Sequence, residues 1–479
     1  MVRTAVVFLL FLFVVMPGQS AATDIGVPTR ETEVLAALAS RADGLARDDR
    51  FSGALLVARK DKVLLRQAWG LADRESKAPV TVDTRFRLGS MNKMFTAVAT
   101  LQLVEAGKLS LDGTVGTYLP DYPNRDVASK VTVRHLLTHT GGTGDIFGPA
   151  FDTNRTTLRE HSDYLKLYGA RGPDHAPGAQ MRYSNYGFVL LGVLIEKVSG
   201  MPYYDYVQRN VFGPAGMTHT ASLPETVDVP NRAVGYMQRD GAWVPNTETL
   251  PYRGMAAGGG YSTLDDLARF AEALQAGRLL TKAMLSQATQ PQAGNNNYGY
   301  GFAFTGSGVS KWYGHGGGAP GMNADLRIYP ESGFVIIALS NLDPPTANLL
   351  ANEAGVKLAA AVRGPPPFST LPVFLRGSFN EWGLRDRLRS SGKNAYVAEV
   401  TLHPGRHELK IGSEDFTEID FGGAVDHEDI GMNRPSRLEM VGTNLVLTVE
   451  HQGRYVFTVD ASDPYAPVLD VKQIGQAAP

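Results

Sequence analysis

The chain of 479 residues contains no cysteine. This excludes disulfide bonds, a thiol nucleophile, thiolate metal sites and a lipid-modified N-terminal cysteine. Neither sign of charge is in clear excess, because 46 Lys and Arg residues stand against 48 Asp and Glu residues. A near-neutral chain of this kind gives no electrostatic reason to expect nucleic acid as a partner. The length favours two folded domains, stabilised by core burial alone.

The N-terminal apolar run, at residues 5–16, is well short of the ~20 residues that a membrane-spanning helix requires. It follows Arg3 and precedes a Pro-Gly break and small residues at Ser20 and Ala22. This order is typical of a signal peptide spanning residues 1–22. We therefore expect an exported protein, periplasmic or extracellular, with no stable membrane insertion after cleavage. An uncleaved anchor is the alternative.

Residues 27–362 are expected to form an α+β domain. A helical stretch at residues 31–47 precedes two apolar runs that flank Lys60-Asp61 in the manner of a hairpin. Further strands are expected only at residues 298–341, and a second long helix follows them. The first and last parts therefore predict one antiparallel sheet, flanked by helices, with a helical region inserted between them.

A different architecture is expected after a proline-rich linker at residues 363–372. Its three consecutive prolines favour an extended, semi-rigid chain. Residues 373–479 then show short apolar strands separated by turn residues, such as VFLRGSFN, AYVAEVTL, RHELKIGS, NLVLTVE and GRYVFTV. This pattern predicts a small all-β sandwich domain.

The stretch GSMNKMFTA at residues 89–97 places Ser90 three residues before Lys93, at the start of an apolar helix expected at residues 91–106. Ser90 could simply cap that helix. However, a capping box would have Glu or Gln where Lys93 stands, and a cation is unfavourable at the positive end of the helix dipole. At this spacing the amine can reach the hydroxyl, and a buried lysine can accept the proton of a serine nucleophile.

Two further motifs follow in the chain. They are Tyr183-Ser184-Asn185 before an apolar helix, and His315-Gly316-Gly317 at the end of a short strand. With Ser90 and Lys93 they give the order Ser-x-x-Lys, Tyr-x-Asn and Lys/His-x-Gly, which resembles the serine β-lactamase and penicillin-binding-protein group. The blocks VRHLLTHTGG, GGGYSTLDDLARF and RIYPESGFVIIALSN are also similar to this family. The resemblance covers roughly residues 27–362 and implies a β-lactamase/transpeptidase-like fold.

The resemblance implies that Ser90 is the acylated nucleophile and that Lys93 and Tyr183 share the proton transfers. It implies that Asn185 orients the substrate. Each of the last two residues also has a plain structural alternative. A buried Tyr183 could satisfy a loop, and Asn185 could cap a helix.

The third motif differs from that of the dedicated antibiotic-destroying enzymes, in which lysine usually stands first. His315 could bind a substrate carboxylate, with a charge that depends on pH, or it could tune Tyr183. The resemblance implies that the N–H groups of Ser90 and Gly318 form the oxyanion hole. Glycine at positions such as Gly317 lets a substrate approach the backbone closely.

Two other patterns in the chain are each typical of a different kind of site. The string HGGG occurs in the oxyanion loop of α/β-hydrolases, but the G-x-S-x-G pentapeptide of that fold is missing. His135 and His139 have the i,i+4 spacing of metal ligands, but HLLTH lacks the glutamate of H-E-x-x-H and a third ligand nearby. We interpret both histidines as structural, and Thr263 with Asp266 as a capping box.

The C-terminal segments LRGSFNEWG and HELKIGSEDFTEIDFGG look like the glycogen- or starch-binding modules found beside glycan-active enzymes. Trp382 in the first segment could stack on a sugar ring, which makes a polysaccharide a possible partner. The alternative is that this tryptophan fills the core of the sandwich.

The sequence therefore predicts an exported serine hydrolase that acts on a small ester, amide or peptide and needs no metal or organic cofactor. An esterase or a D-peptidase-like amidase is favoured, because His315 replaces lysine. The alternatives are a true β-lactamase or penicillin-binding protein, and a non-catalytic binding protein with a glycan-binding module. Loops 143–175 and 219–255 are expected to line the pocket, and neither carries a pattern that identifies the substrate.

Overall fold

The computed structural model describes residues 31–292, 297–363, 368, 371–416, 419–423, 429–440, 442–463 and 467–476. The predicted signal peptide and most of the predicted linker lie outside these residues. The described chain divides into two compact units, each treated by itself below. The first holds residues 45–305 and 311–351, and the second holds residues 31–44, 306–310 and those from 352 onward. The domain boundaries at 362 and 373 stay predictions.

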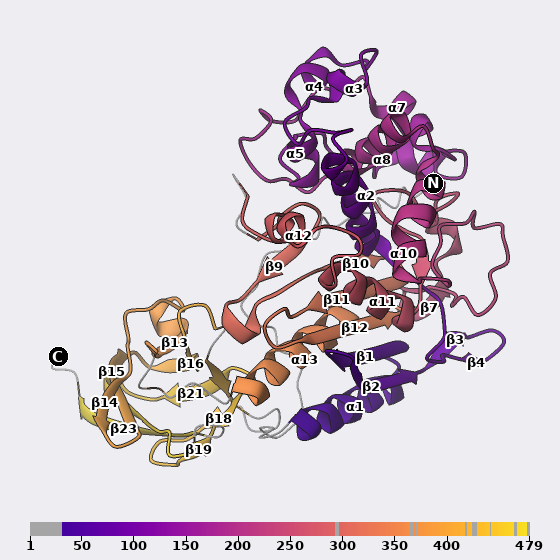
Figure 1. The fold of residues 1–479 in the computed structure, drawn as a ribbon. Helices are drawn as coiled ribbons and strands as arrows, with labels where there is room; N and C mark the ends of the chain where they lie inside the picture. The colour runs from indigo at the N-terminus through magenta and orange to yellow at the C-terminus, as the bar shows by residue number, and fades with distance from the viewer. Residues whose placement is uncertain are drawn as a thin grey trace, which may run out of the picture. The chain divides into compact units, whose positions relative to one another are not determined.

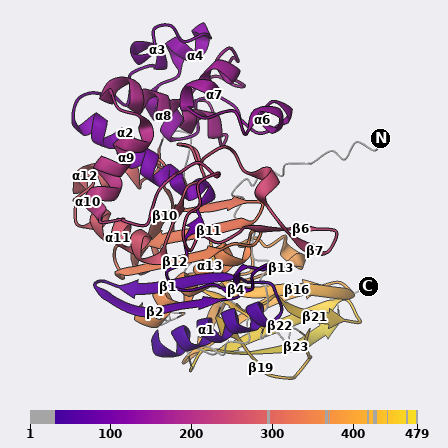
Figure 2. The same cartoon turned by 90° about the vertical axis from the view of Figure 1, so that its right-hand side faces the viewer.

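The first unit is built around a six-stranded antiparallel sheet, whose order is β2 (Lys62–Trp69), β1 (Gly53–Arg59), β12 (Phe334–Ser340), β11 (Met322–Ile328), β10 (Trp312–Ala319) and β9 (Ala303–Thr305). Figure 2 shows β10, β11, β12, β1 and β2 following one another in this order. The predicted hairpin and the pairing of the first strands with the last are therefore confirmed. Gly53 faces Ser340 in β12 and Trp69 in β2.

The helical region is inserted between β2 and β9, as predicted. It contains the helices α2 (Lys93–Glu105), α3 (Val115–Tyr118), α4 (Arg125–Lys130), α5 (Val133–Leu137), α6 (Pro149–Asn154), α7 (His161–Tyr168), α8 (Asn185–Ser199), α9 (Tyr203–Val207), α10 (Gly213–Ala215), α11 (Leu264–Gln275) and α12 (Lys282–Ala288). Between α9 and α10 runs the π-helical turn η2 (Gln208–Phe212). Helices α3, α4, α5, α7 and α8 gather away from the sheet in Figure 1.

Short strand pairs also lie in this part of the chain, where the sequence predicted none. They are β3 (Leu71–Asp73) with β4 (Ala78–Pro79), β5 (Phe86–Arg87) with β8 (Tyr261–Ser262), and β6 (Tyr236–Arg239) with β7 (Ala242–Pro245). The turn η3 (Thr247–Thr249) follows β7. None of these strands exceeds four residues, too few to show a clear alternation of apolar and polar side chains.

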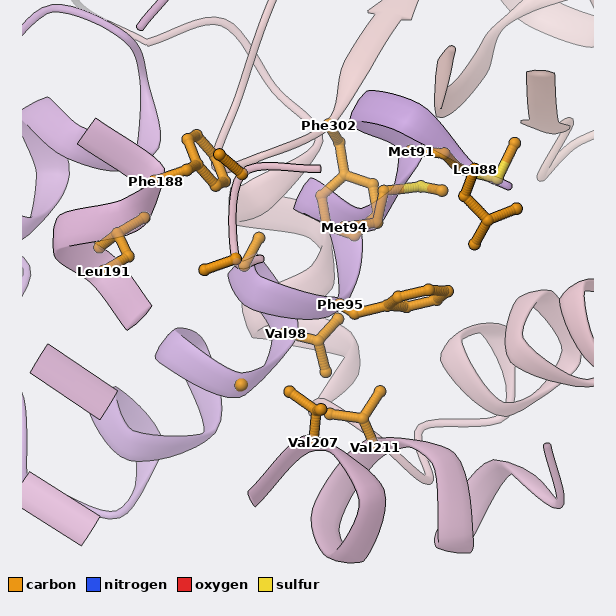
Figure 3. Packing of buried hydrophobic residues seen from close by; sticks show 14 of the residues in the cluster. Leu88, Met91, Met94, Phe95, Val98, Phe188, Leu191, Val207, Val211 and Phe302 are labelled. Atoms are coloured by element: carbon orange, nitrogen blue, oxygen red, sulfur yellow. The ribbon is translucent and has the colours of Figure 1, made fainter. Parts of the chain in front are cut away.

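Helix α2 is the centre of the first unit's core. Every residue from Lys93 to Leu101 is buried. Phe95 packs edge-on against Phe212 and Phe270, with ring centroids 5.0 and 4.8 Å apart. In Figure 3, Val98 of α2 points towards Val207 of α9 and Val211 of η2. The prediction of a buried helix is confirmed, and such packing holds its first turn rigidly.

The start of this helix differs in detail from the prediction. A 3₁₀ turn, η1 (Gly89–Asn92), precedes the regular helix, which begins at Lys93. Neither start has a side-chain cap, and Ser90 lies inside the turn. The alternative in which Ser90 caps the helix is therefore wrong.

The segment YGYGFAF is a strand only from Ala303. At Gly301 the backbone takes a left-handed φ of 75°, and a side chain at Gly299 would lie 1.9 Å from the Ala288 carbonyl oxygen. The chain therefore turns through these glycines before it can pair with β10.

The second unit contains two β-sheets. The first holds β13 (Phe374–Gly377), β16 (Gly405–Gly412), β17 (Asp420–Gly422), β18 (Asp429–Ile430), β20 (Glu439–Met440) and β21 (Leu445–Val449). The second holds β14 (Arg389–Gly392), β15 (Ala395–Leu402), β19 (Ser436–Arg437), β22 (Gly453–Asp460) and β23 (Val468–Gln476). Side chains of both sheets form one hydrophobic core, so the predicted all-β architecture is confirmed.

Four further elements complete the described chain. The predicted long helices are confirmed as α1 (Glu31–Arg47) and α13 (Thr346–Arg363). Short 3₁₀ turns are η4 (Gly308–Ser310) and η5 (Ser378–Asn380). In the second unit, Trp382 is partly exposed, with a left-handed φ of 59°, and it is not among the described core residues. No described helix combines the length and the apolarity needed to cross a membrane.

Candidate active site

Ser90 lies on the 3₁₀ turn η1 and is partly exposed. The preceding residue, Gly89, has a left-handed φ of 54°. Strand β10 presses against this turn, because a Cβ on Gly317 would lie 1.9 Å from the Leu88 carbonyl oxygen. A Cβ on Gly89 would likewise lie 3.0 Å from the Gly318 nitrogen. Glycines thus let the strand backbone reach the turn that carries the serine.

Lys93 is completely buried and has three hydrogen-bond partners. Its Nζ lies 3.2 Å from Ser90 Oγ and 2.7 Å from Asn185 Oδ1, and it also contacts the Ala257 carbonyl oxygen. Burial lowers the pKa of the Lys93 amine to about 7, and the negative charge of Asp145 opposes this shift. At neutral pH a large fraction of this amine is therefore unprotonated and can accept the serine proton.

Tyr183 approaches the same serine. Its hydroxyl shares a hydrogen bond with Ser90, and its ring centroid lies 4.6 Å from Lys93 Nζ. Burial raises the pKa of the Tyr183 phenol well above its usual range. The phenol is therefore protonated at neutral pH and can donate a hydrogen bond, which leaves the unprotonated Lys93 amine as the acceptor in this arrangement.

Asn185 is the first residue of α8, but it does not cap that helix. The cap is Ser184, whose side chain accepts a hydrogen bond from the Gly187 N–H. Asn185 Oδ1 accepts from Lys93, and its Nδ2 lies 3.0 and 3.2 Å from the two carboxylate oxygens of Asp145. The amide thus links the buried lysine to a carboxylate.

The sequence did not single out Asp145, although it belongs to a loop expected to line the pocket. Its carboxylate also accepts hydrogen bonds from the backbone N–H groups of Ile146 and Phe147, at 2.6 and 3.3 Å. Because the NH₂ group of the Asn185 amide donates its hydrogen bonds to this carboxylate, the amide oxygen of Asn185 faces Lys93. The only signal in the sequence was an acidic residue after a glycine-rich turn, which is too common to identify a site.

Asp145→Asn is expected to lower the pKa of Lys93 further, because it removes the negative charge that holds that pKa up. The titration midpoint of Lys93 should move down by roughly 0.5–1 pH units. An NMR titration of labelled lysine side chains measures it, with the Lys93 signal identified by its loss in Lys93→Met. Asp152→Asn, an exposed position on α6, is the matched control and should leave the midpoint in place. An unchanged midpoint in Asp145→Asn would remove this carboxylate from the electrostatics of the site.

His315 is buried in β10, with 1% of its surface exposed. Its Nε2 lies 2.9 Å from the Tyr298 hydroxyl and its Nδ1 lies 2.5 Å from the Gly316 carbonyl oxygen. Burial, together with the charge of Lys93, lowers the pKa of His315 to about 3. In this arrangement the imidazole is neutral at physiological pH and offers no cation to a substrate carboxylate.

His135 and His139, which have the spacing of a metal pair in the sequence, make different contacts in the structure. His135 forms a reciprocal cap with Thr132 at the start of α5. His139 instead lies against Tyr183, with ring centroids 4.2 Å apart. The described residues hold no group of three or more His, Asp or Glu residues that could bind a metal ion. At α11 the Thr263 side chain accepts from the Asp266 N–H, while the Asp266 carboxylate binds elsewhere, so half of the predicted capping box is present.

Comparisons with known proteins agree with this geometry. A family profile described as Beta-lactamase matches residues 38–361. The chain is 32% identical over 325 residues to penicillin-binding protein 4* of Bacillus subtilis, which covers 63% of this chain and 70% of that protein. It is 33% identical over 306 residues to esterase EstB of Burkholderia gladioli, with coverages of 56% and 78%. The structure of a D-stereospecific amidohydrolase from Streptomyces sp. matches with a TM-score of 0.55 at 30% identity, over 66% of this chain and 98% of the other.

Proposed function

The chain belongs to the β-lactamase family of serine hydrolases, and on this basis we propose that it hydrolyses small esters or D-configured amides through an acyl-enzyme on Ser90. The resemblance drawn from the three motifs is confirmed, and the protein is an enzyme. One observation carries the proposal. The Ser90 hydroxyl is shared by the buried Lys93 amine, 3.2 Å away, and the hydroxyl of Tyr183.

The proposed reaction has two halves. In the first, Ser90 Oγ attacks the acyl carbonyl while the neutral Lys93 amine takes its proton. The Tyr183 phenol donates its proton to the departing alcohol or amine and is reprotonated from Lys93. The N–H groups of Ser90 and Gly318 stabilise the oxyanion, a role typically worth ~3–4 kcal/mol for each donor. In the second half, the same Lys93 amine takes a proton from water while the water oxygen attacks the acyl carbonyl. The bond to Ser90 Oγ then breaks, Ser90 regains a proton from Lys93, and the acid is released.

The charges around Ser90 support neutral or amine-bearing substrates over carboxylate-bearing ones. His315 is neutral, Lys93 is only partly protonated at neutral pH, and Asp145 adds a negative charge. A substrate carboxylate, as penicillins carry, would meet no permanent cation among these groups. We therefore place esterase or D-amidase activity ahead of β-lactamase activity. Asn185 orients the acyl portion of the substrate, and its hydrogen bonds to Lys93 and Asp145 restrict the positions that its side chain can take.

A hydrolysis panel tests the substrate class. It consists of short-chain p-nitrophenyl esters, D-amino-acid amides, their L-enantiomers as matched controls, and nitrocefin. We expect kcat/KM for an ester or a D-amide to exceed that for nitrocefin by at least about tenfold, which is 1.4 kcal/mol of transition-state preference. Nitrocefin as the preferred substrate would instead assign the protein as a β-lactamase.

A penicillin-binding protein is the second candidate, because the chain is 32% identical to penicillin-binding protein 4* of Bacillus subtilis. Such a protein would be acylated by a β-lactam and would hardly turn over. Mass spectrometry of the protein after incubation with benzylpenicillin distinguishes the two. A persistent adduct without turnover of any ester or amide supports the second candidate.

Two further assignments belong to the proposal. Residues 1–22 act as a signal peptide, so the enzyme works in the periplasm or outside the cell. The β-sandwich of residues 373–479 holds the enzyme near polysaccharide, with Trp382 stacking on a sugar ring. The partial exposure of Trp382 supports a surface role for this side chain.

A further inference from the structure

His139 occupies an unusual position for a buried polar residue. Its backbone has a left-handed φ of 58°, and its side chain is 1% exposed. Left-handed φ is uncommon outside glycine, although histidine tolerates it better than bulky apolar residues do. Both the backbone strain and the burial of the imidazole cost free energy at this position. A role beyond filling space would explain why a histidine lies here.

Three contacts connect His139 to the segment that carries Tyr183. The His139 carbonyl oxygen accepts a hydrogen bond from the Arg182 N–H at 2.8 Å. Its Nδ1 accepts one from the Ser184 N–H at 3.0 Å. Its ring lies on the Tyr183 ring, with centroids 4.2 Å apart and planes inclined by 32°. The residues before and after Tyr183 are therefore both bonded to His139, and the phenol ring between them rests on its imidazole.

The hydrogen bonds also define the state of the imidazole. Because Nδ1 accepts from a backbone N–H, the ring proton is on Nε2. This Nε2 is buried without a hydrogen-bond partner among the described residues. Burial and the nearby Lys93 and His315 lower the pKa of His139 well below its usual value. The ring is therefore neutral, and its remaining surface is covered by Phe188 and Tyr298, with centroids 5.0 and 4.8 Å away.

We propose that His139 is a positioning residue that holds the Tyr183 hydroxyl against Ser90, through its two backbone hydrogen bonds and its ring contact. This inference rests on the proposed function, because it assigns a purpose to the position of the Tyr183 phenol. His139 does not exchange a proton with the substrate. It limits the movement of a phenol that would otherwise rotate away from the serine, and small displacements of catalytic groups are costly in rate.

A double-mutant cycle with Tyr183→Phe tests the proposal. His139→Asn keeps an acceptor for the Ser184 N–H and tolerates the left-handed backbone, but it lacks the ring. His139→Phe keeps a ring and lacks the acceptor. We expect each to lower kcat by roughly 10- to 100-fold with little change in KM. In the Tyr183→Phe background, which has no phenol to position, each should lower kcat by less than about twofold.

His135→Asn is the matched control, four residues earlier, and should leave kcat unchanged. Thermal melting of every variant shows whether it is folded at the assay temperature, and the cycle uses whichever of the two His139 variants is folded. Equal losses of kcat in both backgrounds would overturn the proposal, and so would failure of both variants to fold, because either result shows a role in the general fold. A wild-type enzyme without ester or amide turnover would instead contradict the proposed function.

Discussion

Ser90→Ala is expected to abolish turnover of every ester and amide that the wild type hydrolyses, with a loss of roughly 10⁴- to 10⁶-fold in kcat. The reason is that the remaining groups, Lys93 and Tyr183, can move protons but cannot form the acyl-enzyme. The measurement is steady-state hydrolysis, together with labelling by a fluorophosphonate and intact-protein mass spectrometry. Wild type should gain one adduct and Ser90→Ala none.

The fold should survive this substitution, because Ser90 is partly exposed and lies outside the hydrophobic core. Its thermal midpoint should stay close to that of the wild type. Ser129→Ala is the matched control, since Ser129 is an exposed serine on α4 whose hydroxyl bonds only to the Arg125 carbonyl oxygen among the described residues. It should leave labelling and kcat intact. An adduct on Ser90→Ala, or an unchanged rate, would place the nucleophile elsewhere.

The predictable part of the fold is the part encoded locally. The apolar runs on either side of Lys60-Asp61 specify a hairpin by themselves, and the apolar residues around much of the circumference of α2 specify a buried helix. Strand β23 does not stand out in the sequence, although it pairs along its length with β22. Its sequence VLDVKQIGQ contains too many polar residues to be identified as a strand from its apolar pattern. Its strand conformation depends on pairing with the neighbouring strand.

The candidate site likewise combines contacts that follow from the local sequence with contacts that depend on the folded chain. Ser90 and Lys93 are neighbours on one turn, so their contact follows from spacing alone. The contact between Lys93 and Asn185 joins residues 92 positions apart, and it was expected only because the motif order resembled a family. Asp145 and the Ala257 carbonyl oxygen complete the surroundings of Lys93 from loops without a pattern, so only the folded chain reveals them. The partner of His315, Tyr298, likewise depends on the turn before β9.

Lys93→Met is expected to lower kcat/KM by roughly 10²- to 10⁴-fold, the range typical of a general base. The wild-type profile should rise with pH through about 7, because only the unprotonated amine accepts the serine proton. With that pKa, about one tenth of the amine is unprotonated at pH 6 and about nine tenths at pH 8, so the rate should increase nearly tenfold. In Lys93→Met this increase of the rate with pH should disappear. Lys108→Met, an exposed lysine just beyond α2, should retain it.

Stability separates this chemical role from a structural one. Between about pH 7 and 10.5 the unfolded chain binds a proton on Lys93 that the folded chain does not, so this lysine makes the fold more stable as the pH rises through that window. At neutral pH the burial of Lys93 therefore opposes folding. The fall of its pKa from 10.5 to about 7 corresponds to a cost of at most roughly 5 kcal/mol in the free energy of folding. Methionine has no such cost, although it loses the hydrogen bonds to Asn185 and Ala257. Lys93→Met should thus melt at the wild-type temperature or above it while hydrolysis collapses. A variant that loses activity only in proportion to its loss of folded protein would show that Lys93 supports the fold and that the base lies elsewhere.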